Sequence, residues 1–245
     1  PLNLSRWQVI ERAKKRLFYS LLRLDLPLQT RASNPEHGLS FRFLADTPVA
    51  KERVLTGHDN GIITIALIEA DDAEREARRT SMGEPYRTLL GHFRHEIGHH
   101  YWDLLVDGRA PLGEFRRLFG DETLDYGEAL EAHYANGAPA GWSQNFISSY
   151  ATCHPWEDFA ETFAHYLHIV DTVEMASSFG VHARVDGQDA DLSIQTGFVP
   201  YTAPDAQTIV DNWVPVASML NNLNRAMGHP DAYPFVLTPQ VVEKL

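Results

Sequence analysis

The stretch PYRTLLGHFRHEIGHHYWDLL, residues 85–105, decides how the rest of the chain is interpreted. Its large apolar side chains recur at the spacing of one helix face, at Leu89, Leu90, Phe93, Ile97 and Trp102. The sequence therefore predicts a helix that starts near Pro85. This helix carries the pattern His-Glu-x-x-His at residues 95–99.

The spacing of this pattern is typical of a metal site. Positions i and i+4 lie on one helix face, so His95 and His99 can both turn a ring nitrogen toward one ion, with Glu96 beside a water that the ion activates. Zinc in such a site lowers the pKa of the water, and the glutamate takes its proton. We therefore expect Zn²⁺ on His95 and His99, with Glu96 as general base. A helix with two surface histidines is the alternative.

A catalytic zinc site also needs a third protein ligand and an open position. Residues 154–165, HPWEDFAETFAH, predict a helix with Pro155 in its first turn, on which Glu157 and Glu161 share a face. We expect Glu157 to be the third ligand. Glu161 is expected to support the ligands by accepting the outward N–H of a ligand histidine, which fixes its tautomer.

Other side chains near these two segments are rival candidates. Asp103 lies four residues after His99 and is a candidate to bind the metal or orient a histidine, but a third inward ligand on the same rigid helix is awkward. His165 and His168 lie further along the second helix, where packing or hydrogen bonding is the expected role. His92 is close to the metal-facing side and is a candidate for substrate contact or ligand support.

The two segments together resemble the gluzincin metallopeptidases, in which His-Glu-x-x-His is followed by a helix carrying Glu-x-x-x-Asp/Glu whose first acid binds zinc. Residues 157–163, EDFAETF, are similar to a segment of the lethal-factor-type toxins. In those toxins a tyrosine seven residues before the zinc glutamate assists catalysis, and that position is Tyr150 here. The resemblance implies that Tyr150 stabilises the oxyanion of the transition state, with His154 as the runner-up.

A second resemblance covers most of the chain. Residues 82–99, with the Pro155 segment, resemble a bacterial family called putative zinc-binding metallopeptidases, from the basic first helix through the Thr56-Gly57-His58 turn to His168. Members usually carry a cysteine-rich zinc ribbon before this domain, and the single cysteine here cannot build one. The resemblance therefore leaves two expectations open: this member lacks the ribbon, or the ribbon has been removed.

These resemblances imply a zincin-like fold and a zinc-dependent peptidase that acts on a peptide or protein substrate. Two alternatives stay open. One is a metal-dependent amidase or deacylase for a small non-peptide substrate, and the other is a catalytically silent zinc-binding interaction domain. The intact Glu96 argues against the silent domain, because a non-catalytic descendant has no chemical need for it.

Composition excludes several other classes. The 245 residues include 21 Lys and Arg against 33 Asp and Glu, a net charge of −12 that would repel nucleic acid. The longest apolar stretch, Ile62–Ile68, is far shorter than the roughly 20 residues that cross a bilayer, so no membrane contact is expected. One cysteine rules out an internal disulfide framework and favours a reducing, cytoplasmic setting.

The remaining pattern predicts an α+β fold with helices dominating. Residues 1–31 form a basic helix, opened by a capping box at Ser5 and Gln8. Residues 39–45 and 54–68 form a small mixed sheet with a turn at 59–61. Its last strand, Gly61–Ile68, is expected to be an edge strand beside the motif helix, where a peptide adds as a further strand.

The second half is predicted to be mostly helical. We expect a helix over 142–151, a long loop or lid over 178–204, and a helix from about 205 to 227. The domain prediction is one zincin-like metallopeptidase domain over 1–245. Its parts are the helix 1–31, the sheet and motif helix 36–103, and a helical part 104–245 that carries the third ligand.

Overall fold

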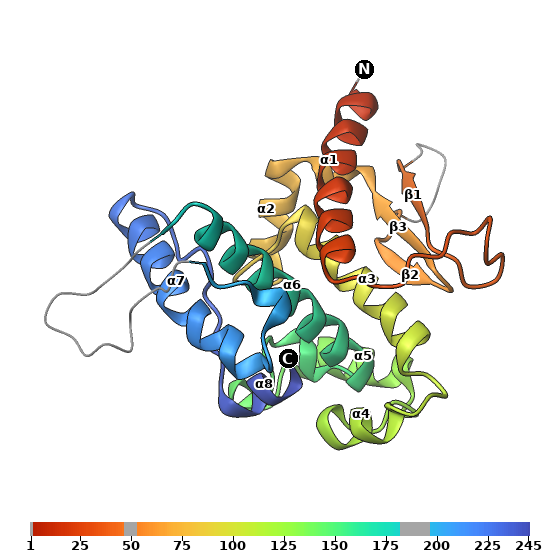
Figure 1. Cartoon of the computed structure of the whole chain (residues 1–245). Coiled ribbons are helices and arrows are strands. Elements are labelled where there is room, and N and C mark those ends of the chain that lie inside the picture. Colours follow the sequence, from red (N-terminus) through yellow and green to blue (C-terminus); the bar gives the residue numbers. More distant parts are fainter. Residues whose placement is uncertain (1, 47–52, 182–196) are drawn as a thin grey trace, which may run out of the picture. The chain divides into compact units, whose positions relative to one another are not determined.

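The computed structural model describes residues 2–46, 53–181 and 197–245 (Figure 1). The chain divides into two compact units, residues 1–120 and 121–245. This division does not decide the prediction of one domain, which stays a prediction. The described elements are mostly helical with one small mixed sheet, so the α+β class is confirmed at this level.

The first unit begins with α1 (Leu2–Arg23), which buries Ile10, Leu17 and Leu21. The predicted helix is present, but the predicted capping box is wrong. Ser5 lies inside the helix, and its Oγ donates to the carbonyl of Leu2 at 2.8 Å. The chain is therefore already helical before Ser5, so Ser5 cannot be the N-cap of this helix.

The sheet has three strands in the order β1-β3-β2. Strand β1 (Ser40–Leu44) runs parallel to β3 (Ile62–Ala66), with Ser40 opposite Ile62, and β2 (Gly57–Asp59) runs antiparallel to β3. The turn between β2 and β3 is as predicted. Gly61 has a φ of +82°, and a Cβ there would lie 2.5 Å from the carbonyl oxygen of His37, so only glycine fits.

The predicted edge strand is wrong, because β3 is the central strand of the sheet. Its side chains Ile63 and Ile65 are fully buried, and its nearly continuous apolar run is typical of a covered central strand. The strand that lies at the edge and contacts the motif helix is β2.

The motif helix is α3 (Leu89–Leu105). It begins after Pro85, because the Oγ1 of Thr88 caps it by accepting from the N–H of Gly91 at 2.9 Å. Phe93 on α3 lies 5.8 Å, between ring centroids, from Phe41 on β1. This contact fixes α3 against the sheet. Helices α2 (Asp72–Ser81) and α4 (Leu112–Phe119) complete the described α-helices of this unit.

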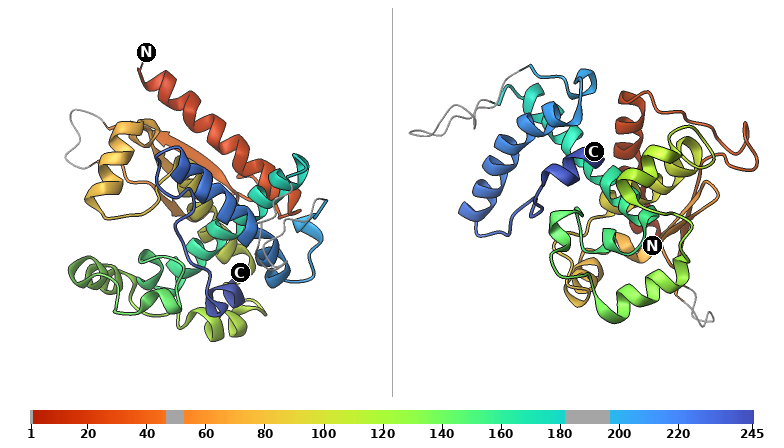
Figure 2. Two further views of the ribbon diagram at one scale, coloured as in Figure 1. Left: turned by 90° about the vertical axis from the view of Figure 1, so that its left-hand side faces the viewer. Right: turned by 90° about the horizontal axis from the view of Figure 1, so that it is seen from below.

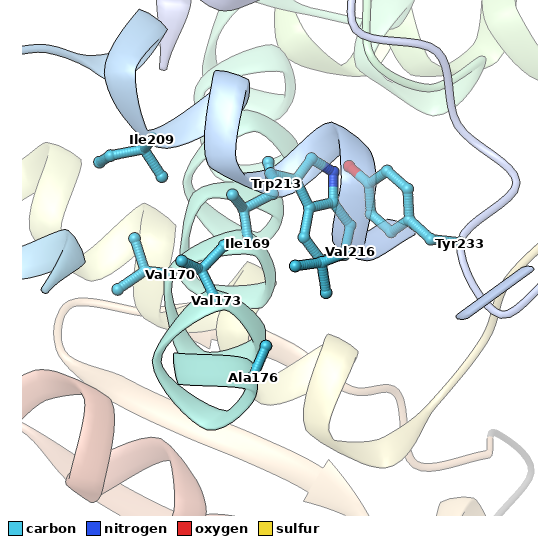
Figure 3. Close-up of a cluster of buried hydrophobic side chains, with 8 residues drawn as sticks. All are labelled: Ile169, Val170, Val173, Ala176, Ile209, Trp213, Val216 and Tyr233. Carbon is cyan, nitrogen blue, oxygen red and sulfur yellow. The ribbon is translucent and has the colours of Figure 1, made fainter. Parts of the chain in front are cut away.

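The second unit contains α5 (Tyr126–Asn136), α6 (Pro155–Ser178), α7 (Ala206–Ala226) and α8 (Pro239–Lys244). Helices α6 and α7 lie side by side (Figure 2). Their contact surface forms a buried cluster (Figure 3) of Ile169, Val170, Val173, Ala176, Ile209, Trp213, Val216 and Tyr233.

Two predictions for this unit have different outcomes. The helix expected over 142–151 is wrong, since the structure has two single 3₁₀ turns there, Trp142–Gln144 and Tyr150–Thr152. The loop or lid expected over 178–204 falls mainly on residues 182–196, which lie outside the described residues. None of the helices in the described part of the chain is both long enough and apolar enough to span a bilayer.

Candidate metal centre

The two histidines of the motif come together on α3. Their Nε2 atoms lie 3.1 Å apart, and His99 is buried. Two nitrogen ligands at about 2.0–2.1 Å from a tetrahedral zinc ion are separated by about 3.3 Å. The spacing of the two rings therefore suits one shared ion.

A carboxylate completes the group. Within residues 2–46, 53–181 and 197–245, one set of three side chains could hold a metal ion, His95, His99 and Glu157, with one ligand atom from each inside a 4.8 Å span. Two imidazoles and one carboxylate form a donor set that zinc accepts in catalytic sites. The group therefore fits the ion that the sequence predicts. Glu96 lies next to His95 on α3 and is buried.

Local structure places Glu157 in the first turn of α6. Pro155 occupies the first turn, and His154 is the N-cap, with its Nδ1 accepting the N–H of Trp156 at 3.1 Å. The Nε2 of His154 lies 3.1 Å from the carbonyl of Leu124, so this nitrogen carries the proton. Both ring nitrogens of His154 thus bind backbone groups, and the side chain fixes the start of the ligand helix.

Tyr126 is a residue of this site that the sequence did not reveal. Its hydroxyl donates to Oε1 of Glu157 at 2.7 Å. The two residues are 31 positions apart, and a lone tyrosine at a helix start carries no local signal of such a contact. Glu157 itself is 1% exposed.

Tyr150, the predicted oxyanion stabiliser, lies in the 3₁₀ turn just before α6. Burial and the negative charge of Glu157 raise its pKa far above that of a free phenol, so its hydroxyl keeps its proton. The pKa of Tyr126 is also raised, first by burial and then by the charge of Glu157. The catalytic role of Tyr150 stays a prediction.

Glu161 accepts a hydrogen bond from Ser148, whose Oγ lies 2.6 Å from Oε2. The same Oγ accepts the N–H of Ala151 at 3.1 Å, so Ser148 ties the preceding turn to α6. The predicted support of a ligand histidine by Glu161 stays a prediction.

Asp103 lies beside a different histidine. Its Oδ2 is 3.8 Å from Nε2 of His58 on β2, and burial, followed by the charge of Asp107, raises its pKa to about 6. His58 accepts the N–H of Gly61 at 2.9 Å, and its ring stacks at 6.3 Å from that of His99. Burial, then His99 and His100, lower the pKa of His58 to about 3, so this ring is neutral.

The other rival histidines lie in separate surroundings. His92 lies 3.3 Å from Oε2 of Glu69, and burial lowers its pKa to about 4. The Nδ1 of His165 lies 2.8 Å from the hydroxyl of Tyr233, and burial lowers its pKa to about 4 as well. Neither histidine belongs to the group of His95, His99 and Glu157.

Similarity to known proteins assigns the chain to a family. Residues 3–245 match the family described as "Putative zinc-binding metallo-peptidase". The chain is 48% identical over 245 residues to uncharacterized proteins of Mycobacterium bovis and Mycobacterium tuberculosis, covering 99% of this chain and 68% of each relative. No solved structure matches the chain. The match over nearly its whole length shows that the chain belongs to this family.

Proposed function

We propose that the chain is a zinc-dependent peptidase of gluzincin type that hydrolyses peptide bonds. In this proposal His95, His99 and Glu157 bind zinc, and Glu96 is the general base. The observation that carries it is the group of two imidazole nitrogens and one carboxylate within 4.8 Å. Membership of the family over residues 3–245 supports the same chemistry.

In the proposed hydrolysis, each residue of the site has its own role. When bound, zinc supplies a Lewis acid that polarises the scissile carbonyl and lowers the pKa of the attacking water. Glu96 accepts the proton of that water and then delivers it to the leaving amine. Tyr150 keeps its hydroxyl proton, so its O–H can donate a hydrogen bond to the oxyanion as charge develops there.

The substrate class is proposed from the sheet. Strand β2 lies at the edge of the sheet order β1-β3-β2 and contacts α3, the helix that carries both histidines. An edge strand can pair with an extended backbone regardless of its side chains. We therefore assign peptide or protein, rather than a small amide, as the substrate.

The test is a peptide library incubated with the zinc-loaded protein and with Glu96→Gln. We expect about one zinc per chain in both proteins by metal analysis. Hydrolysis by the variant should fall by about 10²–10⁴-fold, since the general base is lost while the ligands remain. The exposed Glu36→Gln is the matched control and should cleave as the wild type does.

Two results would contradict the proposal. Unchanged hydrolysis by Glu96→Gln would remove the general base from the mechanism. Loss of zinc in that variant would make Glu96 a ligand instead. Cleavage of small acyl amides without cleavage of any peptide would move the substrate class to an amidase.

A further inference from the structure

Tyr126 is held in one orientation at the start of α5. The preceding residue, Asp125, caps the helix by accepting the N–H of Glu128 at 2.8 Å. The Tyr126 ring meets the ring of His154 edge-on at a centroid distance of 5.5 Å and that of Trp156 at 5.8 Å. Both partners belong to the first turn of the ligand helix α6 or its cap.

Burial in the hydrophobic core does not account for this placement. None of the residues of α5 is buried, and Tyr126 itself is 38% exposed. A tyrosine that served the hydrophobic core would bury its ring more completely. The feature that distinguishes Tyr126 is its hydroxyl, which lies 2.7 Å from Oε1 of Glu157.

The hydroxyl of Tyr126 acts on the carboxylate of Glu157. A phenol has one proton, and that of Tyr126 is donated to Oε1 of Glu157. The bond therefore restrains this one oxygen of the carboxylate.

We propose that Tyr126 is a positioning residue for the zinc ligand Glu157, and that it holds Oε1 so that Oε2 is the oxygen given to the metal. The inference rests on the proposed function. A carboxylate that binds a metal is usually hydrogen-bonded in turn, because the bond restricts its rotation and fixes which oxygen faces the ion. Tyr126 supplies this bond from a different helix than the ligand.

The test compares the zinc affinity of the full chain and of Tyr126→Phe by competition with a chromophoric chelator. Removing the hydroxyl should weaken zinc binding by about 10–100-fold, as loss of a hydrogen-bond partner of a metal ligand does. The visible absorption spectrum of the Co²⁺-loaded protein should also change, because the ligand carboxylate is free to turn. Urea unfolding of the metal-free protein reports whether the fold is intact.

Tyr134→Phe is the matched control, since Tyr134 lies on the same helix and is 62% exposed. It should leave the zinc affinity and the Co²⁺ spectrum unchanged. A loss of zinc affinity in Tyr134→Phe as large as that in Tyr126→Phe would overturn the assignment.

A parallel Glu157→Ala measurement separates this inference from the proposed function. If Glu157→Ala weakens zinc binding while Tyr126→Phe leaves both affinity and spectrum unchanged, the ligand set stands and the positioning role is wrong. If Glu157→Ala itself leaves zinc affinity unchanged, the proposed ligand set is wrong, and the role of Tyr126 falls with it.

Discussion

Glu157 is almost completely buried, and a buried anion is costly unless it is paired or hydrogen-bonded. Tyr126 provides a neutral donor to one oxygen. A zinc ion bound by His95, His99 and Glu157 would place a positive charge directly on this carboxylate. The burial of Glu157 therefore favours it as a ligand over Asp103.

We predict that Glu157→Ala weakens zinc binding by more than 100-fold, beyond the about 10–100-fold cost of losing a ligand's hydrogen-bond partner. Asp103→Ala should weaken it by less than 10-fold on the same scale, because the Oδ2 of Asp103 lies 3.8 Å from Nε2 of His58 and Asp103 is not in the group of His95, His99 and Glu157. Chelator competition at pH 7.5 measures both. The reverse order would make Asp103 the third ligand.

The residues of the candidate metal site that the sequence identifies are those that belong to a local pattern. His95, Glu96 and His99 share one helix, and Glu157 follows a proline that marks a helix start, so pattern alone identifies them as candidates. Tyr126 depends on a contact across 31 positions, which no local pattern encodes.

At the scale of elements, α8 is joined to α6 by a buried ion pair. The Nζ of Lys244 donates to Oδ2 of Asp158 at 2.6 Å and to the carbonyl of Asn145 at 2.7 Å, and it lies 4.4 Å above the ring of Phe146. Asp158 is fully buried. Burial raises its pKa to about 6, and Lys244 opposes this rise.

We predict that Lys244→Met lowers the free energy of unfolding by about 3–5 kcal/mol, because it leaves the buried carboxylate of Asp158 without its cation. Adding Asp158→Asn in the same chain should recover part of the loss, since an amide costs less to bury than a carboxylate. Urea unfolding of the metal-free protein at pH 7.5 measures both variants. A loss below 1 kcal/mol, or no recovery in the double variant, would show that the pair is not needed.

The sequence predicts well those elements whose start or end is marked by a glycine or a proline. The turn before β3 has a glycine at a φ of +82°, and α6 has a proline in its first turn. The helix expected over 142–151 fails because its apolar residues mimic a helical period while Ser148 turns its hydroxyl to the N–H of Ala151. Such side-chain bonds compete with regular helix.

The order of the strands in the sheet cannot be predicted from a local sequence pattern either. Strand β3 is central because β1, which precedes it by about 20 residues, pairs with it in parallel. A run of Ile and Thr predicts a strand, but the neighbours of that strand depend on the path of the whole unit. The edge strand available to a peptide is consequently β2, which is only three residues long.

At the scale of the whole molecule, buried histidines link stability to pH. His165 is buried on α6 with its Nδ1 2.8 Å from the hydroxyl of Tyr233, and burial lowers its pKa from 6.5 to about 4, while Glu161 opposes this shift. As pH falls from 6.5 to about 4, the unfolded chain binds a proton at this ring that the folded chain does not. Stability contributed by the neutral ring is therefore present above pH 6.5 and is lost through this window.

We predict that the free energy of unfolding of the metal-free protein decreases from pH 7 to pH 5, and that His165→Gln makes this decrease shallower by up to about 1.4 kcal/mol per pH unit, the value for one proton. The slope is compared, because the substitution also changes stability at pH 7 by altering the contact with Tyr233. The exposed His229→Gln is the control and should run parallel to the wild type. Equal slopes for wild type and His165→Gln in urea unfolding would show that His165 binds its proton over the same pH range in the folded and the unfolded protein, and that its burial does not keep it neutral.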